Sequence, residues 1–250
     1  MMAALRIFAR HMAVFRKIWF TNIMFNFIEP LLYLTAMGYG LGTFVQDMEG
    51  LTYLQYIAPG MVASSSMFAA SFECTYGSFI RLHYQKTFQA MLAGPVTVRD
   101  IVAGDILYAT FKSMVFGLVI LTVISVLGQT QSWWALLIPL FLVIPGLAFS
   151  LLAFCYTGLT ANIDSFNYYI TLFLTPAYLF SGVFFPIHSM PGWAQVVAWF
   201  NPIFHSVEVC RALALGNTNP GLLVHAGVLV LLAMVLMPLA VRLMTKRLIV

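Results

Sequence analysis

Six stretches of the chain are apolar and long enough to cross a lipid bilayer. They cover approximately residues 19–44, 56–80, 104–127, 133–159, 166–185 and 222–241. A hydrocarbon core about 30 Å thick needs roughly 20 apolar residues in one helix. With 62% hydrophobic and 8% charged residues, the 250-residue chain is unlike a soluble domain. The sequence therefore predicts an all-α integral membrane protein, a single transmembrane domain over residues 1–250 with six transmembrane helices.

The positive charges of the chain are gathered at the ends of these spans. Except for Lys112 and Arg211, every Lys and Arg lies in the N-terminal arm, in residues 81–100 or in the C-terminal tail. Cytoplasmic loops of membrane proteins carry an excess of Lys and Arg, so we expect both termini in the cytoplasm. The same bias accounts for the net charge of +4, and we expect membrane lipids as partners rather than nucleic acid.

The first 18 residues have the pattern of an amphipathic helix. The apolar residues that recur at helical spacing, opposite two arginines, are Leu5, Phe8, Met12 and Phe15. Such a helix lies on the membrane surface with its apolar face in the lipid boundary, and a frayed basic arm is the alternative. Because the arginines interrupt the first apolar run, we expect no cleavable signal peptide.

The segment between the fifth and sixth spans, residues 186–215, is mostly apolar but broken. The residues that interrupt it are Pro186, Pro191, Trp193, Trp199, Pro202 and Arg211. Irregular backbone at membrane depth must be buried in protein or line a wet cavity. We interpret the segment as two short re-entrant helices that dip into the outer leaflet, with a surface loop anchored by interfacial Trp as the alternative.

Three ionisable residues, Glu29, Glu73 and Lys112, lie inside predicted spans. A charge at bilayer depth costs a few kcal/mol unless it is paired or hydrated. At 1.5 Å per helical residue, all three lie about 11–15 Å from the cytoplasmic ends of their helices, so Lys112 is expected to pair with one of the acids. The cluster is then either an ion pair that fixes helix packing or a polar patch in a translocation path, with a proton relay as a third option.

The cytoplasmic segment 81–100 contains a short amphipathic helix that Gly94-Pro95 terminates. Its apolar stripe consists of Tyr84, Phe88, Met91 and Leu92. A short helix that projects from a membrane protein suits the groove of a partner, and a helix resting on lipid headgroups is the alternative.

The sequence carries no motif for catalysis or cofactor binding. It has no G-x-x-x-x-G-K-[ST] phosphate loop and no H-E-x-x-H. The three cysteines and five histidines lack the spacing of metal ligands. We therefore expect no enzyme activity, no ATP site and no cofactor in this chain itself.

Four stretches of the chain resemble the permease subunits of type-2 ABC exporters, and in particular their NodJ-like branch. They are residues 29–42, 58–73, 100–104 and the block 180–211, in which Phe180-Ser181-Gly182, Asn201-Pro202, His205-Ser206 and Arg211 stand out. The resemblance extends over nearly the whole chain. It implies a subunit of the bacterial inner membrane that works as a homodimer with two separate ABC ATPase subunits, which bind ATP and Mg²⁺.

The resemblance also implies roles for particular segments. Residues 81–99 would hold the coupling helix that contacts the ATPase, and 186–211 the paired outer helices. The gate residues there would be Pro186, Trp193, Pro202, His205 and Arg211. The implied activity is export of an amphiphile such as a lipo-oligosaccharide, a glycolipid or a lipid-like molecule. The alternatives are a drug-efflux permease, an ion-coupled secondary transporter and an assembly factor without transport.

Overall fold

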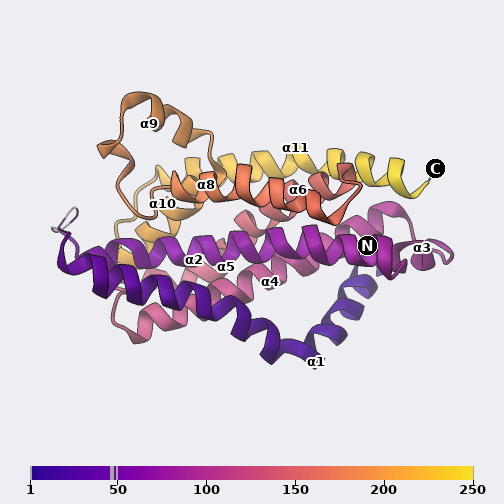
Figure 1. Ribbon diagram of the computed structural model, residues 1–250, viewed down its shortest axis with the longest axis horizontal. Helices are drawn as coiled ribbons and strands as arrows, with labels where there is room; N and C mark the ends of the chain where they lie inside the picture. The colour runs from indigo at the N-terminus through magenta and orange to yellow at the C-terminus, as the bar shows by residue number, and fades with distance from the viewer. Residues whose placement is uncertain (1, 46–47, 49, 250) are drawn as a thin grey trace.

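The helices of the chain form an elongated bundle along one axis (Figure 1). The computed structural model describes residues 2–45, 48 and 50–249, except for the side chains of Phe25, Asn26 and Glu29. Both ends of the chain and the short helix α3 (Thr87–Leu92) lie at one end of the bundle, and α9 (Gly192–Trp199) lies toward the other (Figure 1). The described residues contain no strand beyond one isolated bridge between Met48 and Leu51, which confirms the all-α class.

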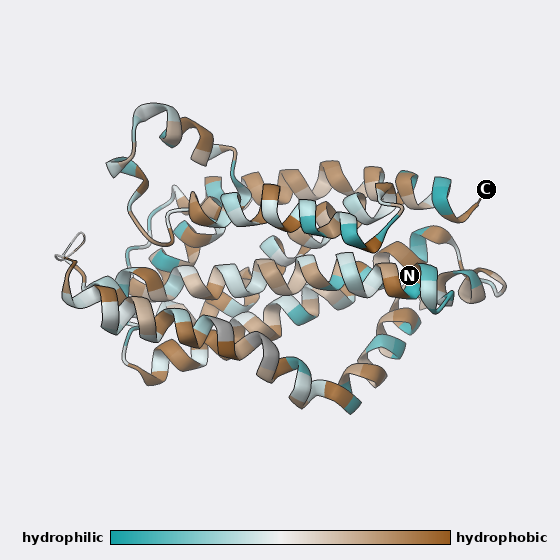
Figure 2. Cartoon of the chain, in the orientation of Figure 1, coloured by the Kyte–Doolittle hydropathy of each residue, from teal (hydrophilic) through white to brown (hydrophobic). Residues whose placement is uncertain are grey.

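Three helices in the described part are long and apolar enough to cross a membrane. They are α4 (Val98–Val126), the stretch Trp133–Leu159 and α11 (Leu222–Leu248). The stretch Trp133–Leu159 comprises η5 (Trp133–Leu137), α5 (Ile138–Phe141) and α6 (Val143–Leu159). Figure 2 shows the long apolar surface of α11, followed by hydrophilic residues near the C-terminus. These three helices coincide with the third, fourth and sixth predicted spans.

The other predicted spans are helices interrupted by wider or tighter turns. The first, residues 19–44, corresponds to the later part of α1 (Met2–Tyr33) with η1 (Leu34–Gly40) and η2 (Leu41–Thr43). The second, residues 56–80, corresponds to most of α2 (Tyr53–Phe72) with η3 (Glu73–Gly77), and η4 (Ile80–Tyr84) begins at its end. The fifth comprises η6 (Ile163–Ser165), α7 (Phe166–Tyr168), η7 (Tyr169–Leu174) and α8 (Thr175–Leu179). Elements η1, η3, η4 and η7 are π-helical, a geometry frequent at functional sites. The number of six spans stays a prediction.

The N-terminal helix leaves the bundle axis at a kink. Ile18 has φ −124° and ψ 17°, so α1 changes direction there (Figure 1). The residues buried on the first part of α1 are Ala4, Ile7, His11 and Phe15. Leu5, by contrast, is 53% exposed. Of the predicted stripe, Phe15 is buried and Phe8 and Met12 are half-buried, whereas the prediction was wrong for Leu5, because the face that packs against α4 is centred on Ile7 and His11.

Close approach to α4 explains which face of α1 is buried. A Cβ atom added to Gly104 would lie 2.7 Å from the Cβ of Ile7, so only glycine lets the two helices meet there. Phe8 and Phe15 flank this contact, and both rings pack edge-on against Phe111 with centroids 6.0 Å away. The first part of α1 is thus fastened to α4, and its position on a membrane surface stays a prediction.

The centre of the bundle is α2, which is buried along nearly its whole length. It packs against α4, α6 and α10 (Pro202–Leu215). Thr52 caps its first turn in a reciprocal capping box with Gln55. Its final turns widen into η3 and η4, and the polar residues Glu73, Thr75 and Ser78 that follow α2 are buried in the protein.

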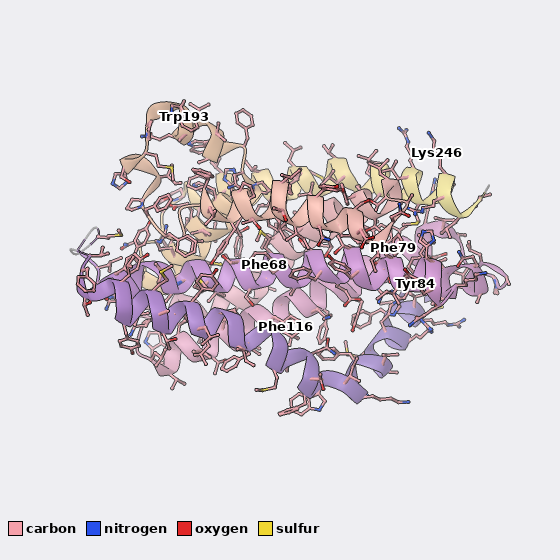
Figure 3. All side chains as sticks on the ribbon, viewed as in Figure 1. Phe68, Phe79, Tyr84, Phe116, Trp193 and Lys246 are labelled. Atoms are coloured by element: carbon pink, nitrogen blue, oxygen red, sulfur yellow. The ribbon has the colours of Figure 1, made fainter. Side chains whose placement is uncertain are left out.

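The broken segment after α8 forms η8 (Ile187–Ser189), α9 and α10. Pro202 is the first residue of α10, a favourable position for proline, and Gly216 ends the helix with φ +88°. Helix α10 is buried, whereas α9 stands off the bundle with Trp193 69% exposed (Figures 1 and 3). Two short helices are therefore present, and their depth in a membrane stays a prediction.

Candidate functional site: a buried charge network

Five ionisable side chains from three segments meet inside the bundle, between the first third and the middle of α4. Glu73 lies in η3, Arg81 in η4, Asp105 and Lys112 in α4, and His11 in the first part of α1. The exposed fractions of the Glu73, Asp105, Lys112 and Arg81 side chains are 8%, 0%, 10% and 12%. The network joins α1, the end of α2 and α4.

The Glu73 carboxylate holds two cations. Its Oε1 atom accepts a hydrogen bond from Nη1 of Arg81 over 2.7 Å, and its Oε2 atom accepts one from Nζ of Lys112, also over 2.7 Å. The structure therefore pairs Lys112 with Glu73. The backbone of Glu29 lies in α1, but its side chain lies outside the described residues.

The Asp105 carboxylate forms the second half of the network. Its Oδ2 atom accepts hydrogen bonds from Nη2 of Arg81 over 3.1 Å and from the Ser78 hydroxyl over 2.5 Å. Nε2 of His11 lies 3.0 Å from Oδ1 of the same carboxylate. Two carboxylates thus face the side chains of Arg81 and Lys112, and Arg81 bridges the two carboxylates.

Local backbone geometry places these groups. Asp105 and Lys112 are seven residues apart on α4, which brings them to the same face two turns apart. A Cβ atom at Gly77 would lie 2.6 Å from Oε1 of Glu73, so the glycine makes room for the carboxylate. The π-helical turns of η3 and η4 then carry Arg81 back toward both acids.

Sequence reasoning identified part of this network. It singled out Glu73 and Lys112 by their depth in the spans, but it assigned Arg81 to the cytoplasmic surface and passed over Asp105 and His11. A signal for Asp105 existed, since its seven-residue spacing from Lys112 puts it on the same helical face. Glu73 and Arg81 are eight residues apart, a spacing that also brings two side chains close to the same face of a helix.

The predicted coupling segment, residues 81–100, follows the network directly. Its helix α3 begins after Lys86, which has the left-handed φ of +52°. Phe88 is completely buried, and Met91 and Leu92 are half-buried against the core, whereas Tyr84 is 66% exposed. The four apolar residues thus do not form one exposed stripe: Phe88 anchors α3 to the bundle, and only Tyr84 is fully available to a partner.

A groove of about 370 Å³ lies beside Tyr84. It is lined by Phe79, His83, Tyr84 and residues 161–164 of the turn between α6 and α7. The rings of Phe79 and His83 pack together with centroids 4.3 Å apart, and both Phe79 and Tyr84 are labelled in Figure 3. The surface of the coupling segment therefore includes a second loop that the sequence did not indicate.

At the other end of the bundle, Arg211 fastens α10 to α2. Its guanidinium donates to the carbonyl oxygen of Gly182 over 2.6 Å and lies 4.0 Å from the Tyr56 ring centroid. Tyr56 also donates its hydroxyl to the Gly182 oxygen over 3.1 Å. Glu208 accepts a further bond from Arg211 over 2.9 Å. This arrangement makes Arg211 a packing centre for the turn that follows α8.

The remaining outer residues predicted from the sequence are dispersed. Nε2 of His205 lies 2.9 Å from the Trp199 carbonyl oxygen, and Nδ1 lies 2.8 Å from Nδ1 of His225 on α11. Pro186 precedes η8, and Pro202 starts α10, so both shape the backbone. Trp193 lies on α9, outside the bundle, and is exposed (Figure 3). The described residues contain no group of three or more His, Cys, Asp or Glu that could hold a metal ion.

Comparison with known proteins decides the family. A sequence model described as ABC-2 type transporter matches residues 3–215. Nodulation protein J of Rhizobium meliloti (strain 1021) is 36% identical over 243 residues, which is 97% of this chain and 92% of the relative. The chain belongs to the ABC-2 type transporter family.

Other relatives also align over most of the chain. Nodulation protein J of Rhizobium leguminosarum bv. viciae is 36% identical over 98% of this chain and 94% of the relative. The inner membrane transport permease YadH of Escherichia coli (strain K12) is 26% identical over 90% of this chain and 87% of the relative. The resemblance to type-2 ABC exporter permeases is thus confirmed.

Membership in the ABC-2 type transporter family defines the class of protein in which the charge network lies. The chain is a multi-pass membrane permease, which belongs to a class of transport proteins rather than enzymes. The family implies a partnership with an ABC ATPase subunit. Helix α11 lies beyond the matched residues 3–215, whereas the charge network and α3 lie within them.

Proposed function

We propose that two copies of this chain form the membrane part of an ATP-driven exporter of the bacterial inner membrane. Each copy carries one ABC ATPase subunit, which binds ATP and Mg²⁺ and contacts α3. Both termini face the cytoplasm, in keeping with the excess of Lys and Arg at that end. The cargo is an amphiphile, such as a lipo-oligosaccharide, a glycolipid or a lipid-like molecule, and it moves away from the ATPase side.

One observation carries this proposal: Arg81 belongs both to the turn that leads into α3 and to the charge network. It lies in η4, five residues before Lys86, and its guanidinium contacts Glu73 and Asp105. A displacement of α3 by the ATPase therefore acts directly on the pairs that join α2 to α4. Because interfaces of this kind hold discrete arrangements, a small movement at α3 is transmitted to the spans.

The same network argues against an ion-coupled secondary transporter. A proton relay needs carboxyl groups that bind and release protons, and a nearby cation holds a carboxylate in its charged form. Glu73 pairs with Lys112 and Arg81, and Asp105 pairs with Arg81 and lies 3.0 Å from His11. The network is thus better suited to mechanical coupling than to proton transfer, and a drug as cargo remains the closest competing function.

The proposal is tested with the chain and a candidate ATPase encoded beside it. The two proteins should copurify, and together in liposomes they should move a fluorescent lipo-oligosaccharide or glycolipid. Addition of ATP and Mg²⁺ to the outside energises only the complexes whose ATPase faces outward, so the cargo should accumulate inside the vesicles. A protonophore should leave this transport intact.

Two results would contradict the proposal. Transport that stops with the protonophore and persists without ATP would indicate a secondary transporter. Transport of a hydrophobic drug but of none of the glycolipids would keep the ATP-driven mechanism and reject the proposed cargo.

A further inference from the structure

A groove of about 980 Å³ lies where the chain from α3 to α4 meets the end of α11. Its apolar walls are formed by Leu92, Val96, Val98, Leu239, Val241, Leu243 and Ile249. Its polar residues are Thr97, Arg99, Arg242, Thr245 and Lys246. The groove is thus mostly apolar, with three cations and no carboxylate among its lining residues.

The three cations come from two helices that are far apart in the sequence. Arg99 is in the first turn of α4, and Arg242 and Lys246 are in the last turns of α11. Among the described residues, none of the three has a carboxylate within ion-pair distance. The neighbouring Asp100 carboxylate accepts hydrogen bonds from the backbone and hydroxyl of Thr97 in the helix cap. The groove therefore presents three available positive charges to a ligand.

The surface of α11 continues the groove toward the middle of the membrane. Residues of α11 that share one face are Leu231, Val235, Leu239, Arg242 and Lys246, which follow one another at spacings of three or four. The apolar members of this face, Leu231, Val235 and Leu239, are 58%, 61% and 43% exposed. Figure 2 shows the change from apolar to hydrophilic along α11, and Figure 3 shows Lys246 projecting from the bundle. An apolar strip that ends in cations has the profile of one lipid leaflet.

We propose that this groove binds one anionic glycerophospholipid of the leaflet next to the chain termini. The phosphate lies between Arg99, Arg242 and Lys246, and the acyl chains lie along the exposed apolar face of α11. Basic pockets between membrane helices bind such headgroups. A free phosphate would leave the apolar walls in water, and a soluble partner would not reach the strip of α11 that faces the hydrocarbon.

The bound lipid would join two parts of the chain that have no covalent connection nearby. The groove includes Leu92 at the end of α3, Arg99 at the start of α4 and the last turns of α11. An anionic lipid there would hold the coupling segment against α11. This inference goes beyond the proposed function, because it concerns a resident lipid and holds for any cargo.

The test compares lipid affinities of the purified chain. Phosphatidylglycerol and phosphatidylcholine with identical acyl chains are titrated onto the protein in detergent, and bound lipids are counted by native mass spectrometry. The wild type should retain one phosphatidylglycerol with clear preference over phosphatidylcholine. In the triple variant Arg99→Gln, Arg242→Gln, Lys246→Gln, affinity for phosphatidylglycerol should fall at least about tenfold, since each cation near a membrane surface contributes roughly fivefold.

A matched control removes the same charge elsewhere. The variant Arg6→Gln, Arg10→Gln, Lys17→Gln loses three exposed cations of the N-terminal helix and should retain the lipid within about twofold. A second variant, Thr245→Trp, fills the groove but keeps all three cations, and it should also weaken binding. Glycerol phosphate at millimolar concentration should not displace the lipid.

Each alternative has its own result. Equal losses in the triple variant and the N-terminal control would indicate general attraction to a basic surface and would overturn the site. Displacement by glycerol phosphate would indicate a phosphate site without lipid. Unchanged affinity in both the triple variant and Thr245→Trp would place the lipid elsewhere on the chain.

Discussion

Arg247 near the end of α11 donates a hydrogen bond to Nε2 of His83 in η4 over 2.6 Å. The same guanidinium also bonds the carbonyl oxygen of Thr157 near the end of α6. Because arginine only donates, Nε2 of His83 must accept, and the imidazole is neutral in this arrangement. One side chain thus joins α6, α11 and the turn that leads to α3.

This contact predicts a pH dependence of stability. Partial burial, and then the charge of Arg247, lower the pKa of His83 from its usual 6.5. Above about pH 6.5 the imidazole is neutral in both the folded and the unfolded chain, so there is no penalty. As the pH falls below that value, the unfolded chain takes up the proton first, and stability decreases until the folded site is protonated as well.

The measurement is the melting temperature of the detergent-solubilised protein between pH 7.5 and 5. His83→Gln keeps an acceptor for Arg247 but does not titrate, so the wild type should lose more melting temperature than this variant over the range, by at most about 2 °C because the pair is exposed. Equal pH dependence of the two proteins would show that His83 does not titrate below its usual pKa.

Because Lys112 and Glu73 are paired in the charge network, replacing Glu73 should partly reverse the damage caused by replacing Lys112. Lys112→Met leaves excess negative charge in a buried cluster and should destabilise the protein by about 3–5 kcal/mol. Adding Glu73→Gln restores neutrality, so the double variant should recover part of the loss in melting temperature and in transport. Lys86→Met, which removes an exposed lysine, is the matched control and should change stability by less than about 0.5 kcal/mol.

Glu29→Gln provides the competing partner in the same experiment. It should not rescue Lys112→Met, because the structure pairs Lys112 with Glu73 over 2.7 Å. Rescue by Glu29→Gln alone would reject that pairing. A fully active and stable Lys112→Met would mean that the lysine is hydrated and that the network carries no shared role.

Substitutions in the predicted coupling segment should have two different effects, depending on whether the side chain is exposed or buried. Tyr84→Asp combined with Gln89→Asp changes exposed side chains and removes one hydrogen bond, from Gln89 to the Leu82 carbonyl oxygen, so the protein should still fold. Copurification with the ATPase should fall about tenfold, equal to about 1.4 kcal/mol. Phe88→Asp buries a charge in the core and should cause loss of the folded protein. Gln131→Glu, exposed before η5, is the control and should bind the ATPase normally. Normal ATPase binding by the Tyr84 and Gln89 variant would place the docking surface elsewhere.

The proposed orientation predicts the labelling of introduced cysteines by a membrane-impermeant maleimide. The natural cysteines Cys74, Cys155 and Cys210 are buried, so background labelling should be low. Gln131→Cys should react in intact cells, whereas Lys86→Cys should react only after the membrane is permeabilised. Gly128 is a poorer position because its φ of +70° disfavours any side chain, and Asp47 lies outside the described residues. The reverse pattern would invert the topology.

The helical, membrane-embedded class and the family could be predicted from the sequence because both depend on local chemistry. A run of about 20 apolar residues has few structures in lipid other than a helix. A charge in such a run is costly, so Glu73 and Lys112 stood out by themselves, and the motifs of the late block indicated the family. The break at Pro186 and the N1 position of Pro202 likewise follow from the fixed φ of proline.

Contacts between segments could not be predicted from the sequence, because they depend on how each helix is oriented about its own axis in the packed bundle. Phe88 has the spacing of an exposed stripe, yet packing turns it into the core, and α1 buries Ile7 and His11 instead of Leu5. The sequence predicts Arg81 on the cytoplasmic surface. In the structure, the wide turns of η3 and η4 place its guanidinium against Glu73 and Asp105. Composition and periodicity thus determined which segments are long and apolar enough to cross a membrane. The tertiary packing of α1, α2 and α4 decided which charges meet, since only packing sets the distances over which they attract one another.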